Sequence, residues 1–196
     1  MLTETARSNA DGMLTCPQLG GASGRPSAWV ARWLADRPPG RVLDLACGSG
    51  RHARWAAGLG HQVLAIDLDA RALEGLQDAR ITPLQEDLEQ GPWSVLAQRF
   101  DVIVCTNYLH RPRMALMLAL LAPGGLWIHE TFAVGNERFG RPRNPDFLLG
   151  EGELLRWAAL AGLQVLGFES GVVREPVQAC VQRIAAVRDV APQALP

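Results

Sequence analysis

One short segment constrains the fold of this 196-residue chain more than any other. Arg41-Val-Leu-Asp-Leu-Ala46 is a mainly apolar run that leads directly into the glycine-rich turn Cys47-Gly-Ser-Gly50. After the turn, Ala53, Ala56 and Ala57 recur at the spacing of one helix face. A buried strand, a tight turn and a helix in this order are typical of a parallel sheet.

The same alternation continues along the chain. We expect further strands at 63–66, 81–85, 100–105 and 126–131, the last of them following the break at Pro123-Gly-Gly125. Helices are expected between them at 71–76 and 114–121. Strands that alternate with helices predict an α/β fold, in which helices cover both faces of a parallel sheet.

The end of the chain has a different pattern. A helix at about 151–161 precedes two β segments, at 163–169 and 177–187, and only seven residues join these two segments. Because a crossover helix needs a longer connection, the last strand must run antiparallel.

The length suits one domain. We predict a flexible N-terminal arm over residues 1–27, a single domain over 28–190 and a tail over 191–196. The first residues lack the pattern of a signal peptide, and the longest apolar run, Met114 to Ala122, has nine residues. We therefore expect a soluble protein with no membrane partner.

Lysine is absent, since all 19 basic residues are arginine. This excludes a Walker phosphate loop and Schiff-base chemistry, which both need lysine. A net charge of −1 gives no general attraction to nucleic acid, which is not an expected partner. Cys16, Cys47, Cys105 and Cys180 lie far apart without metal-ligand spacing, so we expect no metal site and reduced thiols in a cytoplasmic protein.

Polar and glycine markers follow four of the expected parallel strands. They are Gly48 and Gly50, Asp67, Asp87, and the segment Thr106-Asn107-Tyr108. Ligands of open α/β sheets bind at the carboxyl ends of the strands. Glycines let main-chain N–H groups approach a ligand, and a carboxylate can accept hydrogen bonds from ribose hydroxyls. The layout predicts a nucleoside site.

The glycine turn alone leaves the nucleoside open. Gly48-Ser-Gly-Arg-His-Ala53 also satisfies the dinucleotide fingerprint, so an NAD(P)-dependent oxidoreductase stays an alternative. Against it, Asp44 precedes the turn, Asp87 supplies a second acid, and the sheet ends in an antiparallel hairpin. A non-catalytic nucleoside-binding protein is the alternative outside enzymes.

At these residues the chain, from about 41 to 188, resembles the class I S-adenosylmethionine (SAM) dependent methyltransferases. The run from Asp44 to Gly50 is similar to their glycine-rich signature, Asp67 to their ribose acid, and Asp87-Leu88 to their adenine-edge pair. Pro123-Gly-Gly125 resembles the turn before their fifth strand. The Gly50-Arg51 step and the small size resemble the tellurite-resistance and thiopurine type, which acts on small molecules.

This resemblance implies a Rossmann-like sheet of seven strands in the order 3-2-1-4-5-7-6, with strand seven antiparallel. It also implies SAM as the cofactor and S-adenosylhomocysteine (SAH) as its product. The cofactor residues that it implies are Asp44, Ala46, Gly48, Gly50, Asp67, Leu68, Asp87, Leu88 and Asn107.

The resemblance also assigns roles within that set. Gly48 and Gly50 lie beside the methionine part of SAM, and the Ala46 carbonyl meets its ammonium group. Asp67 holds the ribose, Leu68 packs on the adenine face, Asp87 accepts from the adenine amine, and Asn107 borders the sulfonium. Asp69 we interpret as a helix cap only.

Methyl transfer from a sulfonium is an in-line displacement in which positioning contributes most of the catalysis. If a general base exists, it should follow the strand at 100–105, where Tyr108 and His110 lie. A surface contact for His110 and wall packing for Tyr108 are the alternatives. The segment departs from the Asn/Asp-Pro-Pro-Tyr/Phe motif of amino methyltransferases, which argues against exocyclic amine acceptors.

The irregular stretch 132–150 is long enough for a lid or a binding loop. Arg138, Arg141 and Arg143 lie in it, and Arg111 and Arg113 follow the preceding strand. Arginine binds anions through paired hydrogen bonds, so these residues favour an anionic small-molecule acceptor. A solvated loop with internal ion pairs is the alternative.

Overall fold

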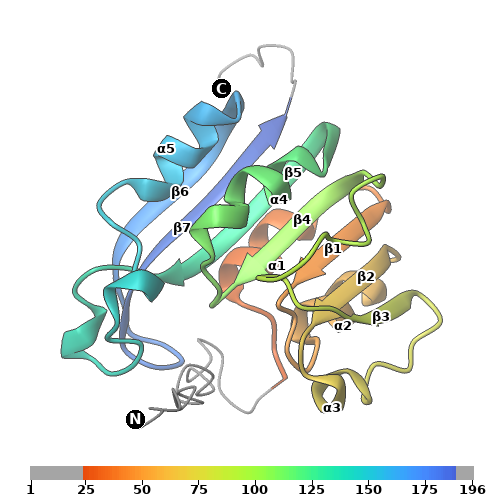
Figure 1. Ribbon diagram of the computed structural model, residues 1–196, viewed down its shortest axis with the longest axis horizontal. Helices are drawn as coiled ribbons and strands as arrows, with labels where there is room; N and C mark the ends of the chain where they lie inside the picture. The colour runs from red at the N-terminus through yellow and green to blue at the C-terminus, as the bar shows by residue number, and fades with distance from the viewer. Residues whose placement is uncertain (1–23, 189–196) are drawn as a thin grey trace, which may run out of the picture.

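Seven strands form one sheet in the computed structural model, which describes residues 24–188 (Figure 1). The strands are β1 (Arg41–Leu45), β2 (Gln62–Asp67), β3 (Ile81–Gln85), β4 (Phe100–Thr106), β5 (Leu121–Phe132), β6 (Leu163–Val173) and β7 (Ala179–Arg188). Their order is β3-β2-β1-β4-β5-β7-β6. Strands β1 to β5 are parallel, and β7 is antiparallel to both β5 and β6. The predicted sheet order and the antiparallel last strand are confirmed.

Helices cover both faces of the sheet. They are α1 (Ala28–Leu34), α2 (Arg51–Gly58), α3 (Ala70–Leu73), α4 (Met114–Ala119) and α5 (Glu153–Leu160), with short 3₁₀ helices η1 (Arg111–Arg113), η2 (Asn136–Arg138) and η3 (Pro145–Phe147). Helices α4 and α5 lie on one face, and α1 and α2 on the other (Figure 1).

Two apolar cores result from this arrangement. On the α1 and α2 face, Ala53, Ala56 and Ala57 pack against the sheet with Trp29 of α1. These three alanines are at most 2% exposed, which confirms the predicted helix face. On the other face, α4 and α5 bury a second cluster that includes Trp127 of β5.

Helix α1 contacts the far end of the sheet through two tryptophans. The rings of Trp29 and Trp33 meet edge to face, and the Trp29 indole N–H donates to the Ile184 carbonyl of β7 at 3.1 Å. Gly167 of β6 lies against these rings, so a Cβ atom there would stand 2.4 Å from Trp33 Cζ2. This contact fixes α1 on the β6–β7 hairpin.

Two predicted helix boundaries are wrong. Helix α3 ends at Leu73 rather than at residue 76. Helix α4 ends at Ala119, because Leu121 already pairs with Phe100 of β4. Pro123-Gly-Gly125 therefore lies inside β5, where the pairing register shifts, rather than before the strand. Gly124, with φ of +72°, allows the chain to turn within this irregularity.

Strand β6 is longer than predicted, since it continues to Val173, whereas β7 begins at Ala179, two residues later than predicted. Most of the predicted N-terminal arm and all of the predicted tail lie outside the described residues. The described Ser27 is buried and caps α1, because its hydroxyl accepts from the Trp29 N–H at 3.1 Å. Within residues 24–188, no helix is long and apolar enough to cross a membrane.

Candidate functional site

The glycine turn after β1 has a left-handed backbone at three positions. The φ angles are +52° at Ala46, +53° at Gly48 and +74° at Gly50. Gly50 is the N-cap of α2, and a Cβ atom there would stand 2.3 Å from Leu76 Cδ2. The turn therefore presents main-chain groups at the carboxyl ends of the parallel strands, which we call the carboxyl edge of the sheet. A nucleoside ligand needs a close approach to such groups.

Asp67, at the end of β2, is bound to that turn. Its Oδ2 accepts from the Gly48 N–H at 2.7 Å, and its Oδ1 accepts from the Asp69 N–H at 2.9 Å. A carboxylate offers about four acceptor positions, so capacity for ligand hydroxyls remains. Beside it, Leu68 is 37% exposed and offers an apolar surface.

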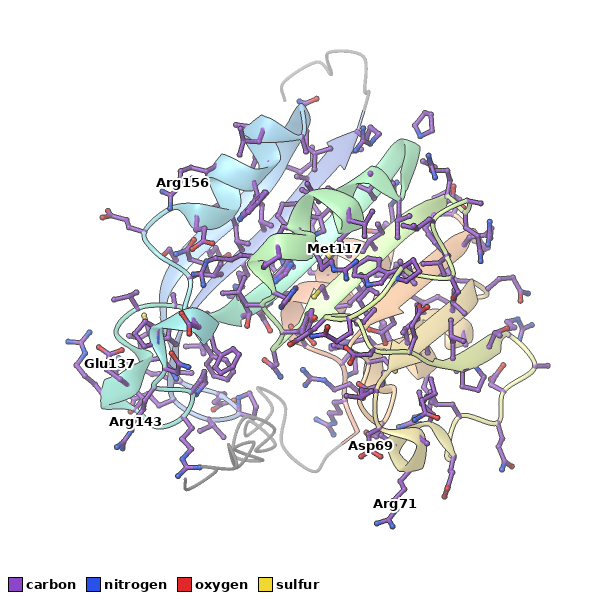
Figure 2. All side chains as sticks on the ribbon, in the orientation of Figure 1. Asp69, Arg71, Met117, Glu137, Arg143 and Arg156 are labelled. Carbon is purple, nitrogen blue, oxygen red and sulfur yellow. The ribbon has the colours of Figure 1, made fainter. Side chains whose placement is uncertain are left out.

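Asp69 caps α3, as predicted, because its Oδ1 accepts from the Arg71 N–H at 3.0 Å. Figure 2 shows both side chains at the same end of the molecule. Asp69 thus supports the helix that follows the ribose-acid position.

Asp44 of β1 lies beneath the turn and is 1% exposed. Its Oδ2 has no hydrogen-bond partner among the residues that the structure describes. Burial raises the pKa of Asp44 to about 7, although the Ala53 N–H and Arg51 both favour the charged form. The carboxyl group is therefore partly protonated near neutral pH.

We expect Asp44→Asn to change the pH dependence of stability. The folded-state pKa lies above the ordinary value of 3.8, so wild-type stability falls as pH rises from about 4 to about 7. The asparagine variant cannot ionise and lacks this fall. Its melting temperature relative to wild type should rise between pH 5 and pH 8, measured without ligand; a constant difference would contradict the assignment.

Asp87 follows β3 and organises its own turn. Its Oδ1 accepts from the N–H groups of Glu89 and Gln90, at 2.8 and 3.2 Å. Leu88 is 5% exposed and packs in the core, and its carbonyl accepts from the Trp93 indole N–H at 3.0 Å. The pair therefore has a structural role beside the predicted adenine contact.

Asn107 and Tyr108 follow β4. Asn107 has a φ of +56°, its N–H donates to the Glu130 carbonyl at 2.9 Å, and its buried Oδ1 has no partner in the described part of the chain. The buried Tyr108 hydroxyl also has none there. Burial, with the nearby Glu89, raises the pKa of Tyr108 above its usual range. Tyr108 is thus protonated at neutral pH and can donate a hydrogen bond, but it is a poor base.

His110 lies in a small hollow beside the end of β4. Its Nδ1 lies 3.8 Å from Glu89 Oε2. The hollow has a volume of about 210 Å³, and its lining includes Glu89, His110, Arg111, Asp146 and Phe147. Phe147 is 40% exposed, so the hollow combines an aromatic surface with the His110 imidazole.

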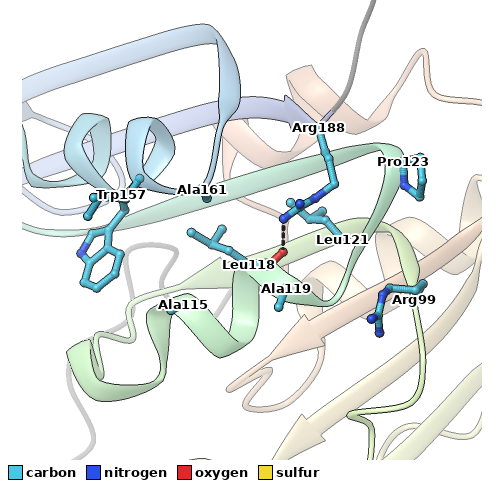
Figure 3. Close-up of a pocket in the computed structure, with 10 residues that line it drawn as sticks. Arg99, Ala115, Leu118, Ala119, Leu121, Pro123, Trp157, Ala161 and Arg188 are labelled. Carbon is cyan, nitrogen blue, oxygen red and sulfur yellow. Dashed lines mark hydrogen bonds between the residues drawn. The ribbon is translucent and has the colours of Figure 1, made fainter.

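A larger hollow, of about 500 Å³, lies at the opposite edge, between α4 and α5 (Figure 3). There Arg188 Nη2 donates to the Leu118 carbonyl at 2.8 Å. Arg99 and Pro123, at the amino ends of β4 and β5, also line it. This hollow therefore lies at the amino ends of the parallel strands, away from the carboxyl edge that carries the glycine turn.

The prediction that Arg111 and Arg113 sense an anionic acceptor is not supported by their contacts. Arg111 forms a forked ion pair with Glu153, at 2.7 and 2.9 Å, and donates to the carbonyls of Asp146 and Leu148, both at 2.7 Å. Arg113 donates to two carbonyls of the turn after β3. Both guanidinium groups therefore donate to main-chain carbonyls of neighbouring loops. No pattern in the sequence indicated these contacts.

The long loop over residues 132–150 is consequently held at its C-terminal end by hydrogen bonds. Besides Arg111, the side chain of Gln182 in β7 donates to the Gly150 carbonyl at 2.6 Å. At the other end, Asn136 Oδ1 accepts from the Cys180 N–H at 3.1 Å, and its Nδ2 donates to the Pro142 carbonyl at 3.2 Å. These contacts favour a fixed loop over a lid.

We expect Arg111→Met to loosen this loop and to lower the free energy of unfolding by ~1–3 kcal/mol, because it leaves Glu153 without its charged partner. Urea denaturation and hydrogen exchange over 144–150 measure the two effects. Arg143→Met is the control, since the exposed Arg143 donates, among residues 24–188, only to the Gly140 carbonyl of its own loop, at 3.3 Å. Equal stability of the two variants would contradict this role of Arg111.

The three loop arginines stand on the surface. Arg138 Nε donates to the Gly135 carbonyl at 3.3 Å, and its guanidinium carbon lies 5.9 Å from the Phe139 ring centre. Arg141 is exposed, and Figure 2 places Arg143 at the rim of the molecule near Glu137. Their predicted contact with an acceptor stays a prediction.

A buried histidine behind the glycine turn was not predicted from the sequence. His52 of α2 accepts from the Ser27 N–H at 3.1 Å through Nε2, and its Nδ1 lies 3.5 Å from Thr106 Oγ1. Burial, with Arg51, lowers the pKa of His52 to about 3, so it is neutral. It joins the start of α1, the glycine turn and the end of β4, three segments whose proximity no local pattern indicates.

Glu130 of β5 is a second residue that the sequence did not single out. It is 4% exposed, and its Oε2 accepts from Arg183 Nη1 at 3.3 Å. Arg183 also pairs with Glu169 of β6. A row of charged side chains therefore runs under α1 toward the end of β4.

Comparison with known proteins agrees with this geometry. The methyltransferase domain family matches residues 42–125. A ubiquinone biosynthesis O-methyltransferase of Xanthomonas euvesicatoria is 32% identical over 167 residues, which cover 69% of this chain and 67% of that protein. A tRNA U34 carboxymethyltransferase of Marinobacter nauticus is 31% identical over 69% of this chain, which spans 47% of that relative's length.

Solved structures share the fold. TehB from Haemophilus influenzae superposes with a TM-score of 0.69 at 19% identity, over 81% of this chain and 61% of that one. A Burkholderia thailandensis 1,6-didemethyltoxoflavin-N1-methyltransferase, crystallised with SAH, superposes with a TM-score of 0.61 at 22% identity, over 85% and 78% of the two chains.

The matching family, the ubiquinone biosynthesis relative and the toxoflavin neighbour are methyltransferases, and none of them supports the NAD(P)-dependent alternative. The cofactor is SAM. The chain belongs to the class I SAM-dependent methyltransferases, the family that its glycine turn and strand-end acids resemble.

Proposed function

We propose that this methyltransferase transfers the methyl group of SAM to a small-molecule acceptor. The observation that carries the proposal is the small hollow, about 210 Å³, beside the end of β4. At about 210 Å³ it is smaller than the pockets of ~300–1,000 Å³ that hold drug-sized ligands, so it suits a small acceptor or part of one, and His110 lines it. The net charge of −1 and the likeness to a ubiquinone biosynthesis O-methyltransferase support the same acceptor class.

The residues of the carboxyl edge fit the cofactor. Asp67 keeps acceptor capacity for ribose hydroxyls while it holds the glycine turn through Gly48. Asn107 has a buried amide oxygen without a partner among residues 24–188, which a ligand can satisfy. The proposed cofactor set is completed by Asp44, the Ala46 carbonyl, Gly50, Leu68, Asp87 and Leu88. When bound, SAM supplies a methyl group on a positively charged sulfur, a leaving group that needs no activation.

The chain's own contribution is then mainly positional. Orientation of the acceptor against the sulfonium supplies most of the acceleration, up to ~7–11 kcal/mol. His110, next to Glu89, is the proposed base where the acceptor carries a proton. Tyr108 stays protonated and contributes a hydrogen-bond donor instead.

Arg138, Arg141 and Arg143 are the proposed contacts for an anionic acceptor, because their loop follows β5 at the same edge. We further propose a cytoplasmic location, in keeping with Cys47, Cys105 and Cys180, which are free thiols.

The release of SAH tests the acceptor class. The protein is incubated with SAM and either a cell extract below 1 kDa, total RNA or denatured protein, and SAH is quantified. We expect release only with the small-molecule extract. Release with RNA, abolished by ribonuclease, would overturn the proposed acceptor and favour a tRNA-type substrate.

A further inference from the structure

His129 lies in the middle of β5, next to the end of β4, and no sequence pattern gave it a role. It is fully buried and meets Trp127 edge to face, with ring centres 5.5 Å apart. Its Nε2 lies 3.2 Å from the Tyr108 carbonyl oxygen. Because a carbonyl can only accept, Nε2 carries the proton and donates it to this bond.

This bond holds a turn whose first residue has a left-handed backbone. Asn107 has a φ of +56°, a conformation that asparagine adopts more readily than most other residues with a side chain. Its N–H donates to the Glu130 carbonyl, and the next carbonyl, of Tyr108, accepts from His129. Two consecutive residues of β5 therefore fix the two consecutive residues that follow β4.

The turn orients two buried polar atoms that have no partner among the described residues, the Tyr108 hydroxyl and Asn107 Oδ1. Asn107 Oδ1 is buried and has no hydrogen-bond partner in the described part of the chain. An unpaired buried oxygen is costly, so a ligand that satisfies it gains affinity. In SAM the electropositive centre is the sulfonium with its methyl group, whereas SAH has a neutral thioether.

We propose that His129 is a positioning residue of the cofactor site: it holds the Tyr108 carbonyl so that the Asn107 amide oxygen faces the sulfonium. The inference rests on the proposed placement of SAM at this edge. His129 then raises the affinity for SAM relative to SAH, and so favours product release, without contacting either molecule.

The neutral state of the imidazole agrees with this role. Burial lowers the pKa of His129 to about 4, although its bond to the Tyr108 carbonyl favours the charged form. The donor at Nε2 is therefore present and uncharged at neutral pH, and it adds no charge beside the sulfonium.

Two variants of similar size separate hydrogen bonding from packing. His129→Gln keeps an N–H donor near the position of Nε2, and His129→Met fills the same space without a donor. Calorimetric titration with SAM and with SAH gives the ratio of their dissociation constants. We expect His129→Met to lower the affinity for SAM relative to SAH by about fivefold, the effect of one lost hydrogen bond. In His129→Gln we expect this ratio to stay within about twofold of wild type.

Tyr108 offers a direct readout of the turn, since it is the only tyrosine of the chain. Protein labelled with 3-fluorotyrosine gives a single ¹⁹F resonance, from Tyr108. We expect His129→Met to shift and broaden this resonance, and His129→Gln to leave it near the wild-type position.

His61→Met is the matched control. His61 is also fully buried, and its Nδ1 accepts from the main-chain N–H of Gly40 at 3.1 Å. It lies at the amino ends of the parallel strands, away from the cofactor site. We expect it to lower stability without changing the SAM-to-SAH ratio or the ¹⁹F signal. If His129→Met does not fold, His129→Asn, whose amide is too short to reach the Tyr108 carbonyl, takes its place in the comparison with Gln.

Two failures are distinguishable. A wild-type protein that binds neither SAM nor SAH would contradict the proposed function. A wild-type protein that binds both, with an unchanged ratio and an unchanged ¹⁹F signal in the donor-free variant, would overturn the role of His129 alone.

Discussion

Asp67→Ala is expected to lower the affinity for both SAM and SAH by about 100-fold or more. The side chain is proposed to bind two ribose hydroxyls, and hydrogen bonds to a charged group contribute ~1.5–3 kcal/mol each. The substitution also removes the acceptor that holds the Gly48 N–H at 2.7 Å. Isothermal titration calorimetry with each ligand measures the loss.

Asp69→Ala is the control at the same edge. Asp69 caps α3 through the Arg71 N–H, so its loss should cost ~1 kcal/mol of stability. We expect the affinity for SAH to stay within about twofold of wild type. A folded Asp67→Ala protein that binds SAH as wild type does would refute the ribose assignment.

The largest expected loss of stability comes from Gly167→Ala. A Cβ atom at this position would stand 2.4 Å from Trp33 Cζ2 and 3.2 Å from Trp29 Cη2, two rings that fix α1. Rigid rings cannot yield as a flexible side chain would, so α1 or β6 must shift. We expect a loss of ~2–3 kcal/mol, seen as a melting temperature lower by roughly 5–10 °C.

Gly58→Ala is the matched control for Gly167→Ala. Gly58 is the last residue of α2, and a Cβ atom added there would meet no neighbouring atom within 4 Å. Alanine favours the helix, so this variant should gain ~0.5–1 kcal/mol. Similar melting temperatures of the two variants would contradict the packing of α1 described above.

Apolar runs and turn residues were sufficient to predict a parallel sheet and its strands, whereas the order of the strands was implied by the family resemblance. Strand β3 has the predicted bounds, and the short final connection predicted the antiparallel β7. The strand-end rule also brought Gly48, Asp67 and Asn107 to one edge, because parallel strands share their direction. These features depend on local sequence and on chain direction alone.

The remaining features depend on contacts between distant segments. Pairing of Leu121 with Phe100 places the Pro-Gly-Gly segment inside β5, and nothing local to it indicates this. Arg111 and Glu153 form an ion pair across 42 positions of sequence. His129 acts on Tyr108 from a neighbouring strand. Contacts of this kind follow from the three-dimensional arrangement of the strands and cannot be read from the local sequence.

The most direct test of the proposed function is to follow the methyl group itself. SAM with a labelled methyl group is incubated with the protein and a whole-cell extract, which is then separated into small molecules, RNA and protein, with Asp67→Ala as the blank. We expect label above the blank in the small-molecule fraction alone. Label in RNA or protein, with none in small molecules, would contradict a small-molecule acceptor.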